Sequence, residues 1–200
     1  MLKKRKRKLF FHCGSINPIL ATELELINDA LKNDEEVILV NAIYGLDSTY
    51  WNPFLFAPFQ NLCNSKFERS IKKLKNNKNF KLIYFKNKNF NIGKIKHSQI
   101  SSINKLRKIK FYSSPIGYGI ASSIQTLLKD NKPNLGLKQN RDLIHKKYVT
   151  SIKIYNFIKQ IILEYQPNEI FIFNGRINES WTIVCLAEKY KINYFTYEIA

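Results

Sequence analysis

Short apolar runs alternate with amphipathic segments along this chain of 200 residues. Five runs are rich in β-branched and aromatic residues and stop at glycine or polar residues, as buried strands do. They begin at Leu9, Glu35, Phe80, Glu169 and Ile192. Because the segments between them have helical periodicity, the pattern predicts an α/β fold, a Rossmann-like and mainly parallel sheet with helices on both faces.

The helical segments repeat apolar residues at spacings of three and four. The first is expected to have Asn17 as its N-cap and Pro18 at its first position. The others are expected at residues 65–77, 98–110, 117–130, 141–165 and 178–190. Residues 44–64 are expected to be irregular, because they contain Pro53 and Pro58.

The domain organisation follows from this alternation. Residues 1–8 are expected to form a basic tail, and residues 9–200 a single Rossmann-like domain. The last predicted strand ends almost where the sequence does, and no helix follows to cover it. We therefore expect the domain to be truncated before a second domain.

The charge is strongly positive, with 33 Lys and Arg against 15 Asp and Glu, a formal net charge of +18. Such a balance favours nucleic acid, an anionic membrane surface or phosphorylated substrates. It is equally explained by A/T-rich codons, which encode the abundant Lys, Asn and Ile. The run "KKRKRK" at residues 3–8 has three interpretations: a solvated tail, a membrane contact or a nucleic-acid patch.

Neither cofactor nor metal chemistry has a clear sequence signal. The three cysteines, Cys13, Cys63 and Cys185, are widely spaced and form no metal motif, which predicts reduced, buried thiols in a cytoplasmic protein and no metal site. Gly117 and Gly119 only partly match a dinucleotide fingerprint. The sequence has no Walker loop and no apolar run long enough to span a membrane.

The candidate ligand-binding residues lie at the carboxyl ends of predicted strands, where open α/β sheets bind ligands. Asn174, Gly175 and Arg176 form a turn between a strand and a helix, where glycine permits a sharp turn and arginine suits phosphate or carboxylate. Glu198 ends the next strand, and it either pairs with Arg176 structurally or shares a catalytic cleft with it.

The loop after the first strand is a second candidate site. Gly14 and Ser15 precede the first helix in "HCGSINP", where they could contact a ligand. This signal is weaker than that of the Asn174 turn, because it consists of two small residues alone.

Two segments resemble a known family. "EYQPNEIFIFNGRINESWTIVCLAEKYKINYFTYE" (residues 164–198) is similar to the F-N-G-R region of glycosyltransferase-like proteins of bacterial capsule and surface polysaccharide. Residues 12–41 look like the first βαβ unit of the same two-domain architecture, GT-B. Relatives often carry paired cysteines where only Cys63 remains, with Lys66 where a partner is expected.

The resemblance implies the acceptor-side, amino-terminal domain of a glycosyltransferase, inactive without its second domain. Arg176 would bind a phosphate or carboxylate, and Glu198 would orient it or act as general base. Implied partners are a sugar acceptor and a nucleotide-sugar donor, and the implied location is the cytoplasm, peripheral to the inner membrane. The alternatives are a non-catalytic remnant or accessory protein for anionic glycan or membrane, and a nucleic-acid-binding module, which the lack of a known motif disfavours.

Overall fold

A computed structural model describes residues 5–86 and 100–198. Its centre is a five-stranded parallel sheet with the strand order β3-β2-β1-β4-β5. The strands are β1 (Arg7–His12), β2 (Glu36–Asn41), β3 (Phe80–Tyr84), β4 (Glu169–Phe173) and β5 (Asn193–Tyr197). The α/β, Rossmann-like prediction is confirmed, and all five predicted strands are present.

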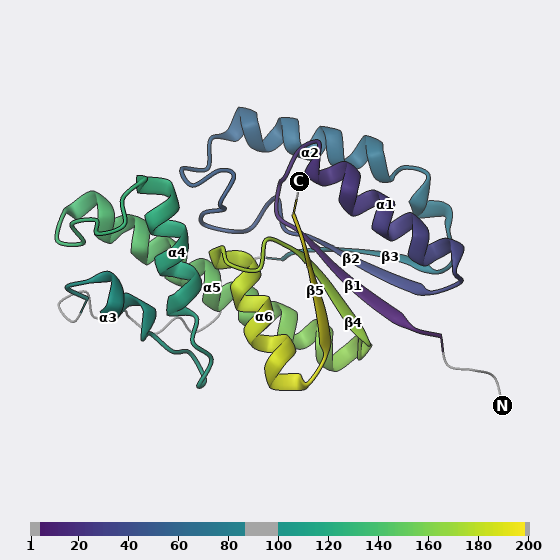
Figure 1. Ribbon diagram of the computed structural model, residues 1–200. Coiled ribbons are helices and arrows are strands. Elements are labelled where there is room, and N and C mark those ends of the chain that lie inside the picture. Colours follow the sequence, from purple (N-terminus) through teal and green to yellow (C-terminus); the bar gives the residue numbers. More distant parts are fainter. Residues whose placement is uncertain (1–4, 87–99, 199–200) are drawn as a thin grey trace.

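Helices cover both faces of the sheet (Figure 1). On one face, Phe10 and Leu39 pack with residues of α1 (Ile19–Lys32) and α2 (Ala57–Ile71). On the other, Phe11 and Val40 pack with residues of α5 (Lys138–Tyr165) and α6 (Asn178–Tyr190). Successive strand residues point to opposite faces, so the near-continuous apolar runs bury both sides of the sheet.

A second core lies beside the sheet. It joins α3 (Ile103–Arg107) and α4 (Gly117–Leu128) to the amino-terminal half of α5. This group of helices stands to one side of the sheet in Figure 1. A short 3-10 helix, η1 (Leu74–Asn76), precedes β3.

Three local predictions are corrected. The N-cap of α1 is Pro18, and no side chain caps this helix, so Asn17 is not its cap. Helix α2 begins at Ala57, well inside the segment expected to be irregular, because a proline is tolerated in the first helical turn. The helix expected at residues 98–110 is described only as the short α3, and residues 98 and 99 lie outside the described residues.

The basic segment before β1 is tied to the protein surface by ion pairs. Arg5 pairs with Asp34 at 2.9 Å, and Lys8 with Glu35 at 2.7 Å. Arg7 pairs with Glu36 and lies in β1, so the strand begins before Leu9. Lys6 pairs with Glu169 at the start of β4 at 3.5 Å. The described part of "KKRKRK" is thus paired with acidic residues of the turn before β2 and of the first positions of β2 and β4.

Candidate active site at the carboxyl ends of the strands

The Asn174 turn lies where the sequence predicted it, between β4 and α6. Asn174 has a φ of 43°, and its side-chain oxygen accepts a hydrogen bond from the Arg176 amide at 3.2 Å. The left-handed residue is therefore Asn174 and not Gly175. A Cβ atom on Gly175 would lie 2.7 Å from Cγ2 of Thr196, so this glycine is required by close packing against β5.

Arg176 and Glu198 are brought together, but weakly. The closest nitrogen and oxygen are 3.9 Å apart, and the side chains are 71% and 55% exposed. Exposed pairs of this kind contribute about 0–1 kcal/mol. Both side chains are free to meet a ligand, yet water surrounds them, and a catalytic role for Glu198 stays a prediction.

Gly14 and Ser15 lie at a more enclosed position, directly after β1. Gly14 has a φ of 94°, a conformation that favours glycine, and it turns the chain so that Ser15 is buried. The Ser15 hydroxyl oxygen is 3.5 Å from Nδ1 of His12, at the long limit of a hydrogen bond. The same His12 nitrogen lies 2.7 Å from Oε2 of Glu23 on α1.

Glu23 extends this chain of polar groups to β5. The Tyr197 hydroxyl is hydrogen-bonded to Glu23, and burial, followed by the Glu23 charge, raises the pKa of Tyr197 far above its usual value. The buried Ser15, His12 and Glu23 and the partly buried Tyr197 therefore form one polar network at the carboxyl edge. Because Glu23 occupies Nδ1 of His12, that nitrogen is not available as the base of a Ser-His-acid triad.

A second buried carboxylate lies close by. Lys147 Nζ on α5 donates to Oε1 of Glu179 on α6 at 3.2 Å, and both side chains are fully buried. Burial raises the pKa of the Cys13 thiol well above its ordinary value, and the charges of Glu179 and Glu23 raise it further. Both carboxylates therefore lie near enough to the Cys13 thiol for their charges to act on it.

Three buried atoms of this cluster have no hydrogen-bond partner within residues 5–86 and 100–198. They are Nε2 of His12, Oε1 of Glu23 and Oε2 of Glu179. Buried polar atoms are nearly always paired, and unpaired ones need an explanation. Two free carboxylate oxygens suit a donor with positive charge, such as an ammonium group.

Sequence reasoning identified Ser15 but missed Glu23, Lys147, Glu179 and Tyr197. A signal existed for two of them. Glu23 follows Leu20 by three residues and precedes Ile27 by four, so it lies on the apolar face of its helix. Lys147 follows Ile144 by three residues and precedes Ser151 by four, so it lies on the buried face of its helix. A charged residue on a buried helical face marks either an ion pair or a site.

A small cavity adjoins this network. Its volume is about 10 Å³, room for about one water molecule. It is lined by Cys13, Gly14, Ile43, Thr49, Asn52, Phe59, Gln60 and Cys63. The β2–α2 loop supplies part of its wall, so a larger ligand requires this loop to move.

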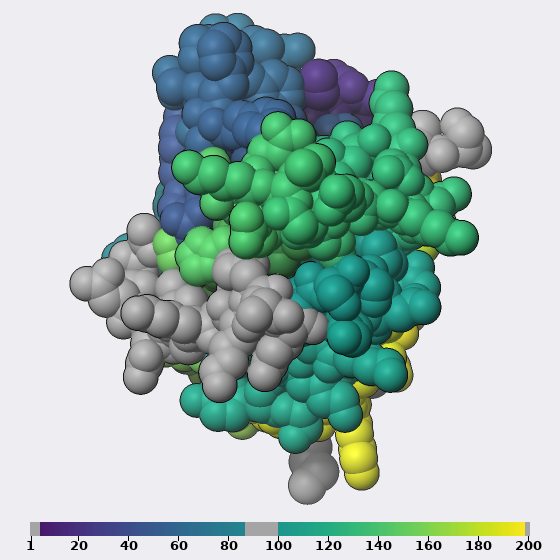
Figure 2. All heavy atoms as spheres, turned by 90° about the vertical axis from the view of Figure 1, so that its left-hand side faces the viewer, coloured from purple at the N-terminus to yellow at the C-terminus, as the bar shows by residue number. Residues whose placement is uncertain are grey.

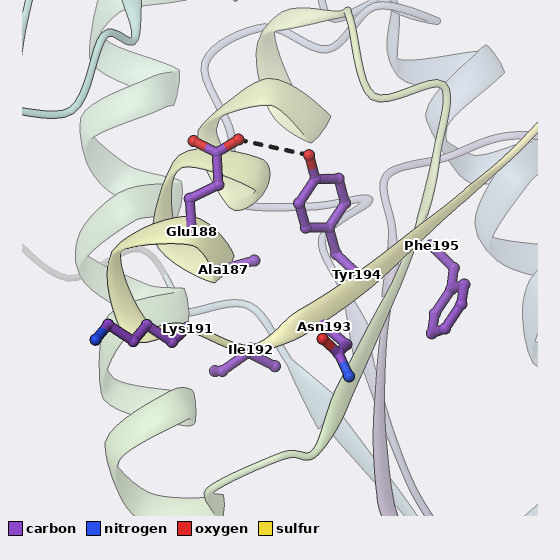
Figure 3. A pocket seen from close by; sticks show the side chains of 7 residues that line it. All are labelled: Ala187, Glu188, Lys191, Ile192, Asn193, Tyr194 and Phe195. Carbon is purple, nitrogen blue, oxygen red and sulfur yellow. Dashed lines mark hydrogen bonds between the residues drawn. The ribbon is translucent and has the colours of Figure 1, made fainter.

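A larger hollow lies at the opposite edge of the sheet. It has a volume of about 500 Å³ and is formed by the end of α6 and the start of β5 (Figure 3). Tyr194 there donates a hydrogen bond to Glu188 at 3.5 Å. Because it lies at the amino end of β5, this hollow is separate from the polar network.

The described part of the chain has neither a metal-binding cluster nor a membrane-spanning helix. Residues 5–86 and 100–198 hold no group of three or more His, Cys, Asp or Glu side chains that could bind a metal ion. Among the same residues, no helix is both long and apolar enough to cross a membrane. All three cysteines are free and buried, as predicted.

No protein-family model and no curated protein matches the sequence. Among solved structures, a CDPS from Fluoribacter dumoffii has a TM-score of 0.50 and 10% identity, over 96% of this chain and 88% of that one. AlbC, a cyclodipeptide synthase from Streptomyces noursei, has a TM-score of 0.44 and 8% identity, over 98% and 96%. A tyrosyl-tRNA synthetase from Leishmania major has a TM-score of 0.43 and 7% identity, over 97% of this chain.

This chain spans only 29% of that synthetase. The likeness to the CDPS shows a shared fold that extends over nearly the whole of both chains. The expected likeness to glycosyltransferases is wrong, because the solved structure that shares this fold over nearly the whole chain is a CDPS. The glycosyltransferase function, the capsule role and the sugar and nucleotide-sugar partners are withdrawn with it.

Proposed function

We propose that this protein is an acyltransferase that takes aminoacyl groups from aminoacyl-tRNA and joins them into a cyclic dipeptide. Likeness in fold to a CDPS over most of both chains supports this. The observation that carries the proposal is the buried Ser15, which is linked through His12 to the Glu23 carboxylate, while the charge of a second buried carboxylate, Glu179, acts on the nearby Cys13. Each carboxylate has one unpaired oxygen. A nucleophile next to an ammonium-binding site suits an amino acid activated at its carboxyl group.

The chemistry requires three acyl transfers. Ser15 is acylated first; the amine of a second aminoacyl-tRNA then attacks the Ser15 ester and frees the serine hydroxyl; and the free amine of the resulting dipeptide attacks its own ester to the tRNA, which closes the ring and releases the tRNA. The first of these transfers uses Ser15 as the nucleophile. The Ser15 hydroxyl oxygen attacks the ester carbonyl, the bond to the ribose oxygen breaks, and the serine proton passes to that oxygen. An aminoacyl ester is already activated, so this exchange of esters requires no nucleotide hydrolysis. The unpaired oxygens of Glu23 and Glu179 would hold the α-ammonium group and fix the carbonyl near Ser15.

Helix α2 supplies a surface for the tRNA. Lys66 and Arg69 lie three residues apart on its exposed side, and the exposed Lys73 follows just after the helix ends. None of the three pairs with an acid among the described residues. Unpaired cations in a row suit phosphates of nucleic acid. The net charge of +18 favours the same partner. Nucleic acid, disfavoured in the sequence analysis, thus replaces the sugar as the proposed partner.

Product analysis tests the proposal. Purified protein is incubated with tRNA charged with a radiolabelled amino acid, and the products are separated by chromatography. We expect a labelled cyclic dipeptide with wild type, none with Ser15→Ala, and product with the control Ser101→Ala, which changes an exposed serine that precedes α3. If wild type forms none from any charged tRNA, or if Ser15→Ala is as active as wild type, the proposal fails.

A further inference from the structure

An exposed apolar patch stands at the start of α2. Phe54 is 78% exposed, Phe56 65% and Leu62 48%; these three residues are called the aromatic patch below. Phe56 and Leu62 also line a groove of about 440 Å³, together with Trp51, Asn52, Pro58 and Phe59. Clustered exposed aromatic side chains next to a groove mark an interaction surface.

The patch is held outward by an anchored turn. The buried Asn52 receives a hydrogen bond from the Phe56 amide at 2.7 Å and donates one to the Phe56 carbonyl at 3.0 Å. Its own amide donates to the Thr49 hydroxyl at 2.9 Å. Leu55, between the two phenylalanines, has a φ of 56°. Three of the five residues from 52 to 56, namely Phe54, Leu55 and Phe56, thus expose their side chains on a fixed scaffold.

The patch connects the candidate active site with the basic side of α2. Asn52 and Phe59 line both the groove and the small cavity beside Gly14. In the other direction, Leu62 precedes Lys66 by four residues, so the two lie on the same side of the helix. The surface that carries this loop and α2 is uncovered in the space-filling view (Figure 2). A ligand bound along α2 therefore crosses the patch before it reaches Ser15.

We infer that the aromatic patch stacks against unpaired nucleotides at the acceptor end of the tRNA. This inference rests on the proposed function. Bases have two apolar faces and stack on aromatic side chains with little regard to sequence, while neighbouring cations bind the phosphates. Phe54 and Phe56 before the start of α2, Leu62 on it, and Lys66 and Arg69 further along the same helix provide this combination. The stacked strand leads the aminoacyl group from α2 to the loop that closes the cavity.

Two tRNA probes test the inference. One is intact uncharged tRNA, and the other is the same tRNA with its unpaired 3′ nucleotides removed by an exonuclease. We expect Phe54→Ala/Phe56→Ala to weaken binding of intact tRNA by about tenfold or more and to leave binding of the trimmed tRNA unchanged. Wild type should bind trimmed tRNA about as weakly as the double variant binds the intact form. Fluorescence anisotropy measures each dissociation constant.

Two control variants separate stacking from general effects. Tyr112 is 65% exposed, as Phe56 is, and it lies elsewhere on the surface. Tyr112→Ala should change neither the affinity for intact tRNA nor the affinity for trimmed tRNA. Lys66→Ala/Arg69→Ala should weaken both tRNAs equally and reduce the salt dependence of binding. Circular dichroism checks that each variant is folded.

The outcomes distinguish the inference from the proposed function. If wild type binds no tRNA, both are overturned. If wild type binds tRNA but the phenylalanine variant loses nothing, or loses equally with both probes, only the inference is overturned. Phosphatidylglycerol vesicles test the rival occupant: if the variant loses vesicle binding and keeps full affinity for intact tRNA, the patch is a membrane contact and the inference is wrong.

Discussion

Replacing Lys147 with methionine tests the buried charge pair beneath the site. Lys147 and Glu179 are both fully buried, with 3.2 Å between Nζ and Oε1. Methionine retains most of the apolar stem, so the cavity left behind is small. The substitution removes the positive charge and leaves Glu179 buried without its partner. Breaking such a pair on one side costs about 3–5 kcal/mol of unfolding free energy.

That cost should be easily measured. For a chain of this length, 1 kcal/mol lowers Tm by about 2–4 °C, so Lys147→Met should lower it by about 6–20 °C. Urea unfolding followed by circular dichroism gives the free energy directly. The double variant Lys147→Met/Glu179→Leu has no unpaired charge and should be more stable than the sum of the single changes implies.

An exposed pair provides the matched control. Lys75 lies 2.7 Å from Glu68, and both side chains are partly open to solvent. Lys75→Met should cost less than about 1 kcal/mol. If Lys147→Met costs as little as Lys75→Met, then Lys147 and Glu179 are not a buried pair, and the assignment of Glu179 to the site is wrong.

Three further predictions concern packing, pH and the accessibility of the thiols. Gly175→Ala should destabilise the protein by about 1–3 kcal/mol, because the new Cβ would lie 2.7 Å from Cγ2 of Thr196. Thr196→Ser removes this methyl group and should restore much of the lost free energy of unfolding in urea. An unchanged urea midpoint for Gly175→Ala would contradict the close contact. Burial raises the pKa of Cys185 to about 12, whereas the unfolded thiol ionises near 9.0. Folding stability should therefore fall as the pH rises from 9.0 toward about 12. Iodoacetamide at pH 8, followed by mass spectrometry, should label Cys13, Cys63 and Cys185 only after denaturation, and rapid labelling of the native protein would show that the thiols are accessible.

The sheet was predictable because its strands carry their own signal. Runs such as Leu9–Phe11 are apolar throughout, and a strand covered by helices on both faces requires that. The start of α2 was not predictable in the same way. In most contexts a proline such as Pro58 indicates that no helix is present. In the first turn of a helix, however, it costs no hydrogen bond, and only the tertiary structure shows which of these two cases applies.

The candidate site was predicted in part. Gly14 and Ser15 followed from the rule that parallel sheets bind ligands at their carboxyl edge. The wrong family came from the Asn174 turn. Its Asn-Gly pair meets the backbone demands of a strand–turn–helix connection and the contact with Thr196, so it reports the fold and not the substrate. Tyr197 and Glu23 are far apart in sequence and meet only through folding.

The acyl-enzyme itself is the most direct measurement. Wild type is mixed with aminoacyl-tRNA, quenched in acid within seconds, digested with protease and analysed by mass spectrometry. We predict that the peptide containing Ser15 gains the mass of one aminoacyl residue, and that Ser15→Ala gains none. An aminoacyl group found on another residue, or no covalent adduct while cyclic dipeptide still accumulates, would contradict the role of Ser15 as the nucleophile.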